Sequence, residues 1–232
     1  MHRPAQTTMP PSPVRSIELA WLVVLLFVSP ARAGAVDASG PVSPGDLTAI
    51  ERDDAAAEKA AEAGDVRTAL KYFDYFGHEQ EAFAKATVEY RRARHTLRTA
   101  VTDKFGRPAW RRAAASLGSS RRGRDRRRSA RREGDVVYVR DGGARHETPY
   151  VRDDGVWKVS VREVLLLAVR ARIGKDVEYE EADLHVLAGK MAGVLGGRAE
   201  RLRSIAESVR SGRIGATEQL EQAIKSVRGG GS

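Results

Sequence analysis

Arginine is concentrated in one part of the chain. Residues 107–132 hold eleven arginines and one aspartate, a net charge of +10, whereas the whole 232-residue chain carries +9, so the remainder sums to −1. Arginine side chains present planar forks of donors that fit phosphate and carboxylate groups, and several together bind polyanions in a salt-dependent way. The candidate polyanion-binding residues are Arg121, Arg122, Arg124, Arg126, Arg127, Arg128, Arg131 and Arg132.

Residues 119–134, which contain most of these arginines, have no aromatic residue and no apolar residue larger than alanine. We therefore expect an exposed, disordered loop that enters no core and does not read specific nucleic-acid sequences. The polyanions available outside the cytoplasm are lipid head groups and anionic envelope polymers. A neutral insertion, rich in arginine through the codon usage of a high-GC bacterial genome, is the second interpretation.

The histidines and acids do not predict a catalytic or metal centre. The five histidines lie at positions 2, 78, 95, 146 and 185, and no two have a zinc-ligand spacing. Glu181 and His185 are four residues apart on a predicted helix, where a solvated polar face is favoured over a weak metal site. The chain also lacks a nucleophile elbow, a phosphate-binding loop and a dinucleotide-binding fingerprint. We expect no catalytic residue, metal or cofactor.

Aromatic residues near the predicted strands have two interpretations. Tyr138, Tyr150 and Trp157, together with His146, could line a small-molecule pocket between the sheet and the helices. The same rings could simply fill the core, which we favour because a small sheet needs large buried side chains.

The first 33 residues have the features of a cleaved secretory signal peptide. Arg3 and Arg15 precede an unbroken apolar run of ten residues, Leu19–Val28, and Ala31-Arg32-Ala33 resembles a cleavage site. Ten residues cover only about half of a bilayer core of roughly 30 Å, although a single N-terminal membrane anchor is the alternative. The chain contains no cysteine, so the exported protein has no disulfides to support its fold. We expect a periplasmic or extracellular protein.

Residues 135–161 are the only part of the chain that predicts β-structure. Short β-branched and aromatic runs separated by Asp-Gly turns predict a three-stranded antiparallel meander. Helical patterns on both sides predict an α+β fold, mostly helical, in which N-terminal and C-terminal helices pack this small sheet. We expect a flexible leader over 34–46, a single domain over 47–228 and a disordered tail over 229–232.

Individual helices follow from apolar spacing and from Gly and Pro positions. They are predicted over 47–63, after a cap at Asp65 to a stop at Gly77, over 80–105, from Pro108 to Leu117, from Val164 to a stop at Gly174, over 180–209 with a bend or split at Gly196-Gly197, and after a cap at Thr217.

The second hairpin allows two registers. A three-residue loop, Asp153-Asp154-Gly155, pairs Arg152 with Val156 and places Val151 opposite Trp157, and this is the register we predict. A two-residue loop would instead place Tyr150 opposite Val159.

The order of these elements also carries a resemblance. Ala63-Gly64-Asp65, Tyr72-Phe73, Lys104-Phe105-Gly106 and the run from Tyr150 to Val159 resemble uncharacterised exported bacterial proteins in which a helical half precedes a V-R-x-D-G-x-W-K-V hairpin. That hairpin is similar to one in SnoaL-like and nuclear-transport-factor-like cone folds, and the resemblance covers about residues 55–165.

Two functions follow as hypotheses. The first is a non-enzymatic binding or scaffold module of the cell envelope whose basic loop contacts polyanions. The alternative, implied by the cone-fold resemblance, is a small-molecule-binding protein or enzyme with an aromatic pocket.

Overall fold

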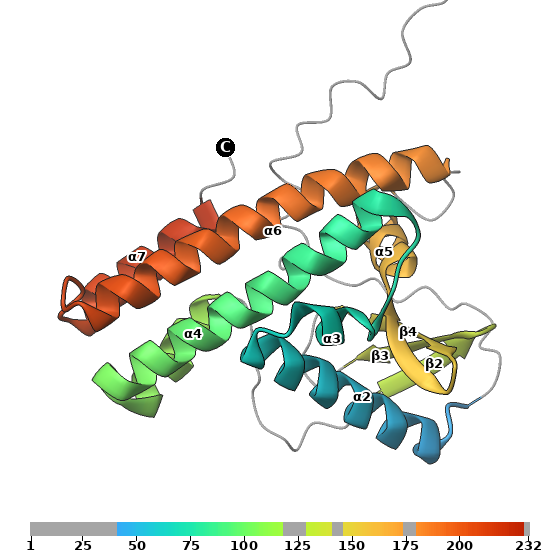
Figure 1. Ribbon diagram of the computed structural model, residues 1–232, viewed down its shortest axis with the longest axis horizontal. Helices are drawn as coiled ribbons and strands as arrows, with labels where there is room; N and C mark the ends of the chain where they lie inside the picture. Colours follow the sequence, from blue (N-terminus) through green and yellow to red (C-terminus); the bar gives the residue numbers. More distant parts are fainter. Residues whose placement is uncertain (1–40, 118–128, 141–145, 174–179, 230–232) are drawn as a thin grey trace, which may run out of the picture.

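The computed structural model describes residues 41–117, 129–140, 146–173 and 180–229 and shows a mostly helical α+β fold, as predicted (Figure 1). The expected signal peptide at 1–33, the leader up to residue 40, the arginines from 121 to 128, the turn at 141–145 and the residues 230–232 lie outside the described residues.

The first described helix is α2, Pro44–Ala63. Ser43 caps it by accepting a hydrogen bond from the Asp46 amide at 3.0 Å, and Pro44 occupies the first turn, where its missing N–H costs nothing. The predicted leader therefore ends three residues too late. Asp65 then caps the short α3, Val66–Leu70, through a hydrogen bond from the Thr68 amide.

The two predicted helices over 80–105 and 108–117 are confirmed as the two helical segments of α4, Gly77–Ser116, which meet at a kink. Gly106 interrupts it with φ 79° and ψ 168°, a conformation that glycine adopts without steric cost. Pro108 stands in the first turn beyond the kink, as predicted.

The sheet has five strands rather than three. They are β1 Phe73–Asp74, β2 Ser129–Glu133, β3 Val136–Arg140, β4 Thr148–Asp153 and β5 Val156–Ser160. The order across the sheet is β1-β5-β4-β3-β2, with β1 parallel to β5 and every other pair antiparallel. The predicted meander is thus correct for β3 to β5, but two strands were missed. The loop predicted over 119–134 is wrong for 129–133, which form β2.

The hairpin register is the alternative that we did not favour. Asp153 pairs with Val156, so the loop holds only Asp154 and Gly155. Both loop residues have positive φ, 50° and 77°, which is the geometry of a two-residue turn that matches strand twist. Consequently Tyr150 lies opposite Val159, and Val151 and Trp157 lie on opposite faces of the sheet.

Three helices follow the sheet: α5 Val161–Ile173, α6 Glu181–Arg210 and α7 Thr217–Gly229. α5 begins directly after β5, three residues earlier than predicted. The split predicted as one alternative at Gly196-Gly197 is wrong, because α6 continues through both glycines. In the parts of the chain that the structure describes, no helix is both long and apolar enough to cross a membrane.

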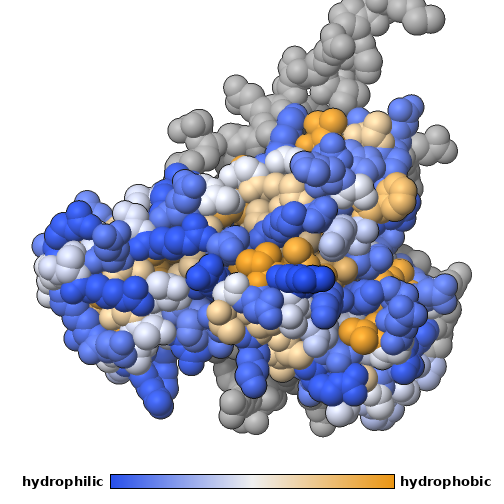
Figure 2. Space-filling model, viewed as in Figure 1, coloured by the Kyte–Doolittle hydropathy of each residue, from blue (hydrophilic) through white to orange (hydrophobic). Residues whose placement is uncertain are grey.

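Two apolar clusters hold these elements together, and the long helices α4 and α6 lie side by side across both (Figure 1). One cluster joins the sheet to α2, α5 and the first halves of α4 and α6. The other joins the second halves of α4 and α6 to α7. The sheet is therefore attached to one end of a helical hairpin. Figure 2 shows that hydrophilic residues cover most of the face seen in Figure 1.

Candidate functional site

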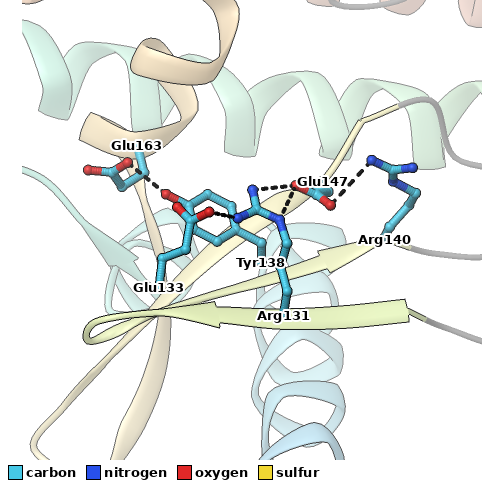
Figure 3. A network of polar contacts seen from close by, with 6 residues as sticks. All are labelled: Arg131, Glu133, Tyr138, Arg140, Glu147 and Glu163. Carbon is cyan, nitrogen blue, oxygen red and sulfur yellow. Dashed lines mark hydrogen bonds and ion pairs between the residues drawn. The ribbon is translucent and has the colours of Figure 1, made fainter. Parts of the chain in front are cut away.

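The two faces of the sheet differ in character. Side chains alternate along each strand, so Val137, Tyr150 and Trp157 share one face, which packs in the core with α2. Arg131, Tyr138 and Arg140 point from the opposite face and form a polar network, drawn in Figure 3.

Arg131 is the centre of this network. Its Nε and Nη2 donate to one oxygen of Glu147, at 3.0 and 2.7 Å, and its Nη1 donates to Glu133. Its guanidinium lies 4.1 Å from the ring centroid of Tyr138, a cation–π distance. Arg140 donates to the other Glu147 oxygen at 3.2 Å. Arg131 is therefore held by carboxylates on two sides and by an aromatic ring, with its donors committed to the protein itself.

Tyr138 links the network to α5. Its hydroxyl donates to Glu163 Oε2 at 3.0 Å, and the residue is only 2 % exposed. Burial, and then the negative charge of Glu163, raise the pKa of Tyr138 to about 12. The phenol is therefore neutral at physiological pH and acts as a fixed hydrogen-bond donor rather than as a base.

The predicted pocket is wrong in its geometry. Tyr138 pairs with Pro149 while Tyr150 pairs with Val137, so Tyr138 lies on the opposite face from Tyr150 and Trp157. The three rings cannot line one cavity, because successive strand residues point to opposite faces. Tyr150 and Trp157 are 7 % and 2 % exposed and belong to the core cluster, which confirms the core-filling interpretation for these two. His146 is half-buried beside Glu147.

Arg132, the next predicted binding residue, lies on the face of Trp157. It donates to Asp46 Oδ2 at 3.0 Å, and Arg152 approaches Asp46 Oδ1 at 3.9 Å. Both guanidinium groups lie 6.0 Å from the Trp157 ring centroid. Arg132 therefore fastens β2 to the first turn of α2. Of the arginines in the predicted run, Arg131 and Arg132 are thus held in place by carboxylates of the same chain.

Asp53 of α2 accepts a backbone hydrogen bond at the edge of the sheet, next to β5. Its Oδ2 accepts a hydrogen bond from the backbone N–H of Trp157 at 2.9 Å, and its Oδ1 accepts one from Arg52 at 2.8 Å. Two residues further, the N–H of Val159 donates to the Tyr72 carbonyl beside β1. Asp53 thus continues the edge pairing of β5 beyond the short β1. Burial alone would raise the pKa of Asp53, but these hydrogen bonds outweigh it and lower that pKa.

Glu181 and His185, the pair considered for a metal, have separate partners. His185 Nδ1 lies 3.2 Å from Glu79, and Glu181 lies 3.4 Å from Arg162. Among the described residues, no group of three metal-binding side chains comes together.

The arginines that precede the undescribed part of the run are less engaged. Arg112 pairs with Glu221 at 3.3 Å. Arg107 and Arg111 are exposed, and no hydrogen bond or ion pair joins either of them to another described residue.

Sequence reasoning missed the acids that hold Arg131, Arg132, Tyr138 and the Trp157 backbone in place: Asp46, Asp53, Glu133, Glu147 and Glu163. Some of their contacts are local, such as Glu133 with Arg131 and Asp53 with the adjacent Arg52. The Asp46–Arg132 and Asp53–Trp157 contacts join residues 86 and 104 positions apart, so no local pattern indicates them.

Comparisons with known proteins add no functional evidence, and the cone-fold resemblance stays a prediction. No family model, no curated protein and no solved structure matches this chain.

Proposed function

We propose that the protein is a non-enzymatic binding module that contacts polyanions through the arginine run. The observation that supports this proposal is the division of charge within residues 107–132. Where the fold uses these arginines, it supplies acids: Glu133 and Glu147 for Arg131, Asp46 for Arg132. Arg107 and Arg111 are exposed without described partners, and the six arginines from 121 to 128 are accompanied in the sequence by a single acid, Asp125.

The excess charge acts locally. The Debye length is about 8 Å at physiological ionic strength, so cations elsewhere on the molecule contribute little to the field around this run. Outside the run the chain sums to −1, which gives no general attraction to anions. Binding to a polyanion must then depend on these arginines and weaken steeply as salt rises.

Retention on heparin tests the proposal. In the test variant, the six arginines from 121 to 128 become serine, which lowers the net charge from +9 to +3 (9 − 6 = 3). In the control variant, six exposed cations elsewhere become glutamine, with the same arithmetic: Lys59, Arg67, Lys71, Arg98, Lys190 and Lys225. We expect the test variant to lose retention and the control to keep it. Equal retention of parent and test variant, or no retention of the parent at low salt, would refute the proposal.

The place of action is a further part of the proposal. Residues 1–33 have the sequence of a signal peptide, so we propose that the protein works outside the cytoplasm. N-terminal sequencing of protein recovered from bacterial periplasm should begin at Gly34. Recovery of an uncleaved chain in the membrane fraction would instead support the anchor.

A further inference from the structure

Among the described residues, three large apolar side chains are notably exposed: Tyr75 at 36 %, Phe76 at 76 % and Val186 at 56 %. They gather where α4 and α6 begin, because Gly77 lies against His185, whose Cε1 is 2.9 Å from the position of a Cβ on Gly77. Figure 2 shows apolar surface in this region, at the upper right. We call Tyr75, Phe76 and Val186 the aromatic corner.

The segments that carry the aromatic corner also carry exposed acidic side chains. Exposed carboxylates come from the end of β1 and the first turns of α4 and α6: Asp74, Glu79, Glu180, Glu181 and Asp183. Glu79 is paired with His185 and Glu181 with Arg162, which leaves a surplus of negative charge. Exposed aromatic rings beside surplus carboxylates provide the two interactions that arginine makes best, stacking and forked hydrogen bonds.

The protein already binds an arginine in this way. Arg131 stacks on Tyr138 and donates to Glu133 and Glu147. The aromatic corner presents the same chemical groups on the surface, without an arginine over Phe76 in the described part of the chain.

One buried group beneath the corner also lacks a partner. Gln80 is 1 % exposed, and its Oε1 accepts a hydrogen bond from the Phe76 N–H at 3.1 Å. Its Nε2 is buried and donates to no described acceptor. This unpaired donor lies beside the Phe76 backbone, at the base of the corner.

We propose that the aromatic corner binds the arginine-rich residues 121–128 of a second copy of this chain. Charge complementarity selects this occupant, because the chain carries +10 in residues 107–132 and −1 elsewhere. This self-association goes beyond polyanion binding, although both use the same arginines.

The fold favours a second copy over the chain's own arginines. β2, which follows these arginines, is the sheet edge opposite to β1, four strand spacings or about 19 Å away. The kink of α4 at Gly106 lies about 44 Å along the helix from Gly77, at 1.5 Å per residue. The described residues on either side of the run, Leu117 in the cluster with α7 and Ser129 in β2, thus lie away from the corner, whereas another copy is free to present several arginines together.

Sedimentation velocity of the full chain over a range of concentrations tests the proposal. All variants share the same N-terminus, so residues 1–40 cannot cause a difference between them. The corner variant carries Phe76→Ser, Glu180→Gln and Asp183→Asn, and the run variant has the six arginines from 121 to 128 as serine. We expect the parent to associate at low salt and dissociate at high salt, and each variant to weaken association about tenfold or more.

Mixing the two variants gives the decisive result. The corner variant still offers its arginines and the run variant still offers its corner, so a heterodimer should form in the mixture although neither variant associates alone. A control with Glu200→Gln and Glu207→Gln, exposed acids further along α6, should associate like the parent.

The outcomes separate this proposal from polyanion binding. The corner variant should keep full retention on heparin, since its arginines are intact. A parent that stays monomeric at low salt, a corner variant that associates like the parent, or a mixture that forms no heterodimer would each overturn the self-association. Concentration-independent protection of the run from trypsin, lost in the corner variant, would show docking within one copy and would also overturn it.

Discussion

Replacement of Asp53 by alanine tests how α2 is fastened to the sheet. The substitution leaves the Trp157 N–H buried without an acceptor, which costs about 1–3 kcal/mol, and removes a charge-assisted hydrogen bond. We expect the free energy of unfolding to fall by about 2–3 kcal/mol in total. Asp53→Asn keeps an oxygen acceptor and loses only the ion pair to the largely exposed Arg52, so it should cost about 1 kcal/mol or less.

Asp54→Ala is the matched control. Asp54 is adjacent and half-buried, and among the described residues its side chain pairs with Arg91, at 3.7 Å, rather than with the sheet edge. Its loss should change the free energy of unfolding by about 0.5–1 kcal/mol at most. Urea denaturation followed by circular dichroism measures all three variants. Equal destabilisation by Asp53→Ala and Asp54→Ala would refute the reasoning.

The same contact has a pH dependence. The pKa of Asp53 is lowered in the folded protein, so its charged form stabilises the fold fully above the unfolded-state pKa of about 4. This contribution is lost as pH falls through the folded-state pKa. The stability difference between the parent and Asp53→Asn should therefore be constant near neutral pH and shrink in acid, and a difference that grows in acid would contradict this.

Three further perturbations have expected outcomes. Trp157→Ala should lower the free energy of unfolding by about 3–5 kcal/mol, because the ring is 2 % exposed, and a melting temperature reduced by only a degree or two would contradict its burial. Gly189→Ala and Gly193→Ala should each raise the free energy of unfolding by up to about 1 kcal/mol, because a Cβ at either position meets no described atom within 4 Å. A lower free energy of unfolding would contradict this open space. Tyr138 has its pKa raised to about 12, so the stability that its neutral form gives should be full below about pH 10 and lost towards pH 12. An ultraviolet alkaline titration of the parent should show a late tyrosine step that Tyr138→Phe lacks.

The sequence predicted those elements whose signals are local. Apolar spacing and the residues Gly64, Gly106 and Pro108 located the helices, because caps and kinks depend on a few adjacent residues. The strand β1 could not be predicted in this way. It has two residues and exists only because it pairs in parallel with β5, some 86 positions away in the sequence.

The strand β2 shows a different limit. Its sequence, Ser129–Glu133, has no large apolar side chain and reads as a solvated loop. Backbone pairing with β3 and the contacts with Asp46 and Glu147 hold β2 in the sheet. In the sequence, Asp46 and Glu147 are far from β2, and β3 follows it after a turn. The sequence-based prediction therefore placed Arg131 and Arg132 among the polyanion-binding residues, although both form ion pairs with acids of the same chain.

The hairpin register could have been decided from the sequence. Asp154-Gly155 is a strong two-residue turn signal. The two-residue loop also places Tyr150 and Val159 on the face of Trp157, which gathers the large apolar side chains on one side of the sheet. The three-residue loop that we predicted would have put Tyr150 on the other face.

The salt dependence of polyanion binding tests the central claim most directly. A double-stranded DNA oligonucleotide serves as a polyanion probe, and log Kobs is measured against log salt concentration for the parent and for the variant with the six arginines from 121 to 128 as serine. Each lost phosphate contact reduces the slope by about 0.9, so the slope should become shallower by up to about 5. The control without six cations elsewhere should keep the slope of the parent. Identical slopes for the parent and the six-arginine variant would contradict the proposal that this run binds polyanions.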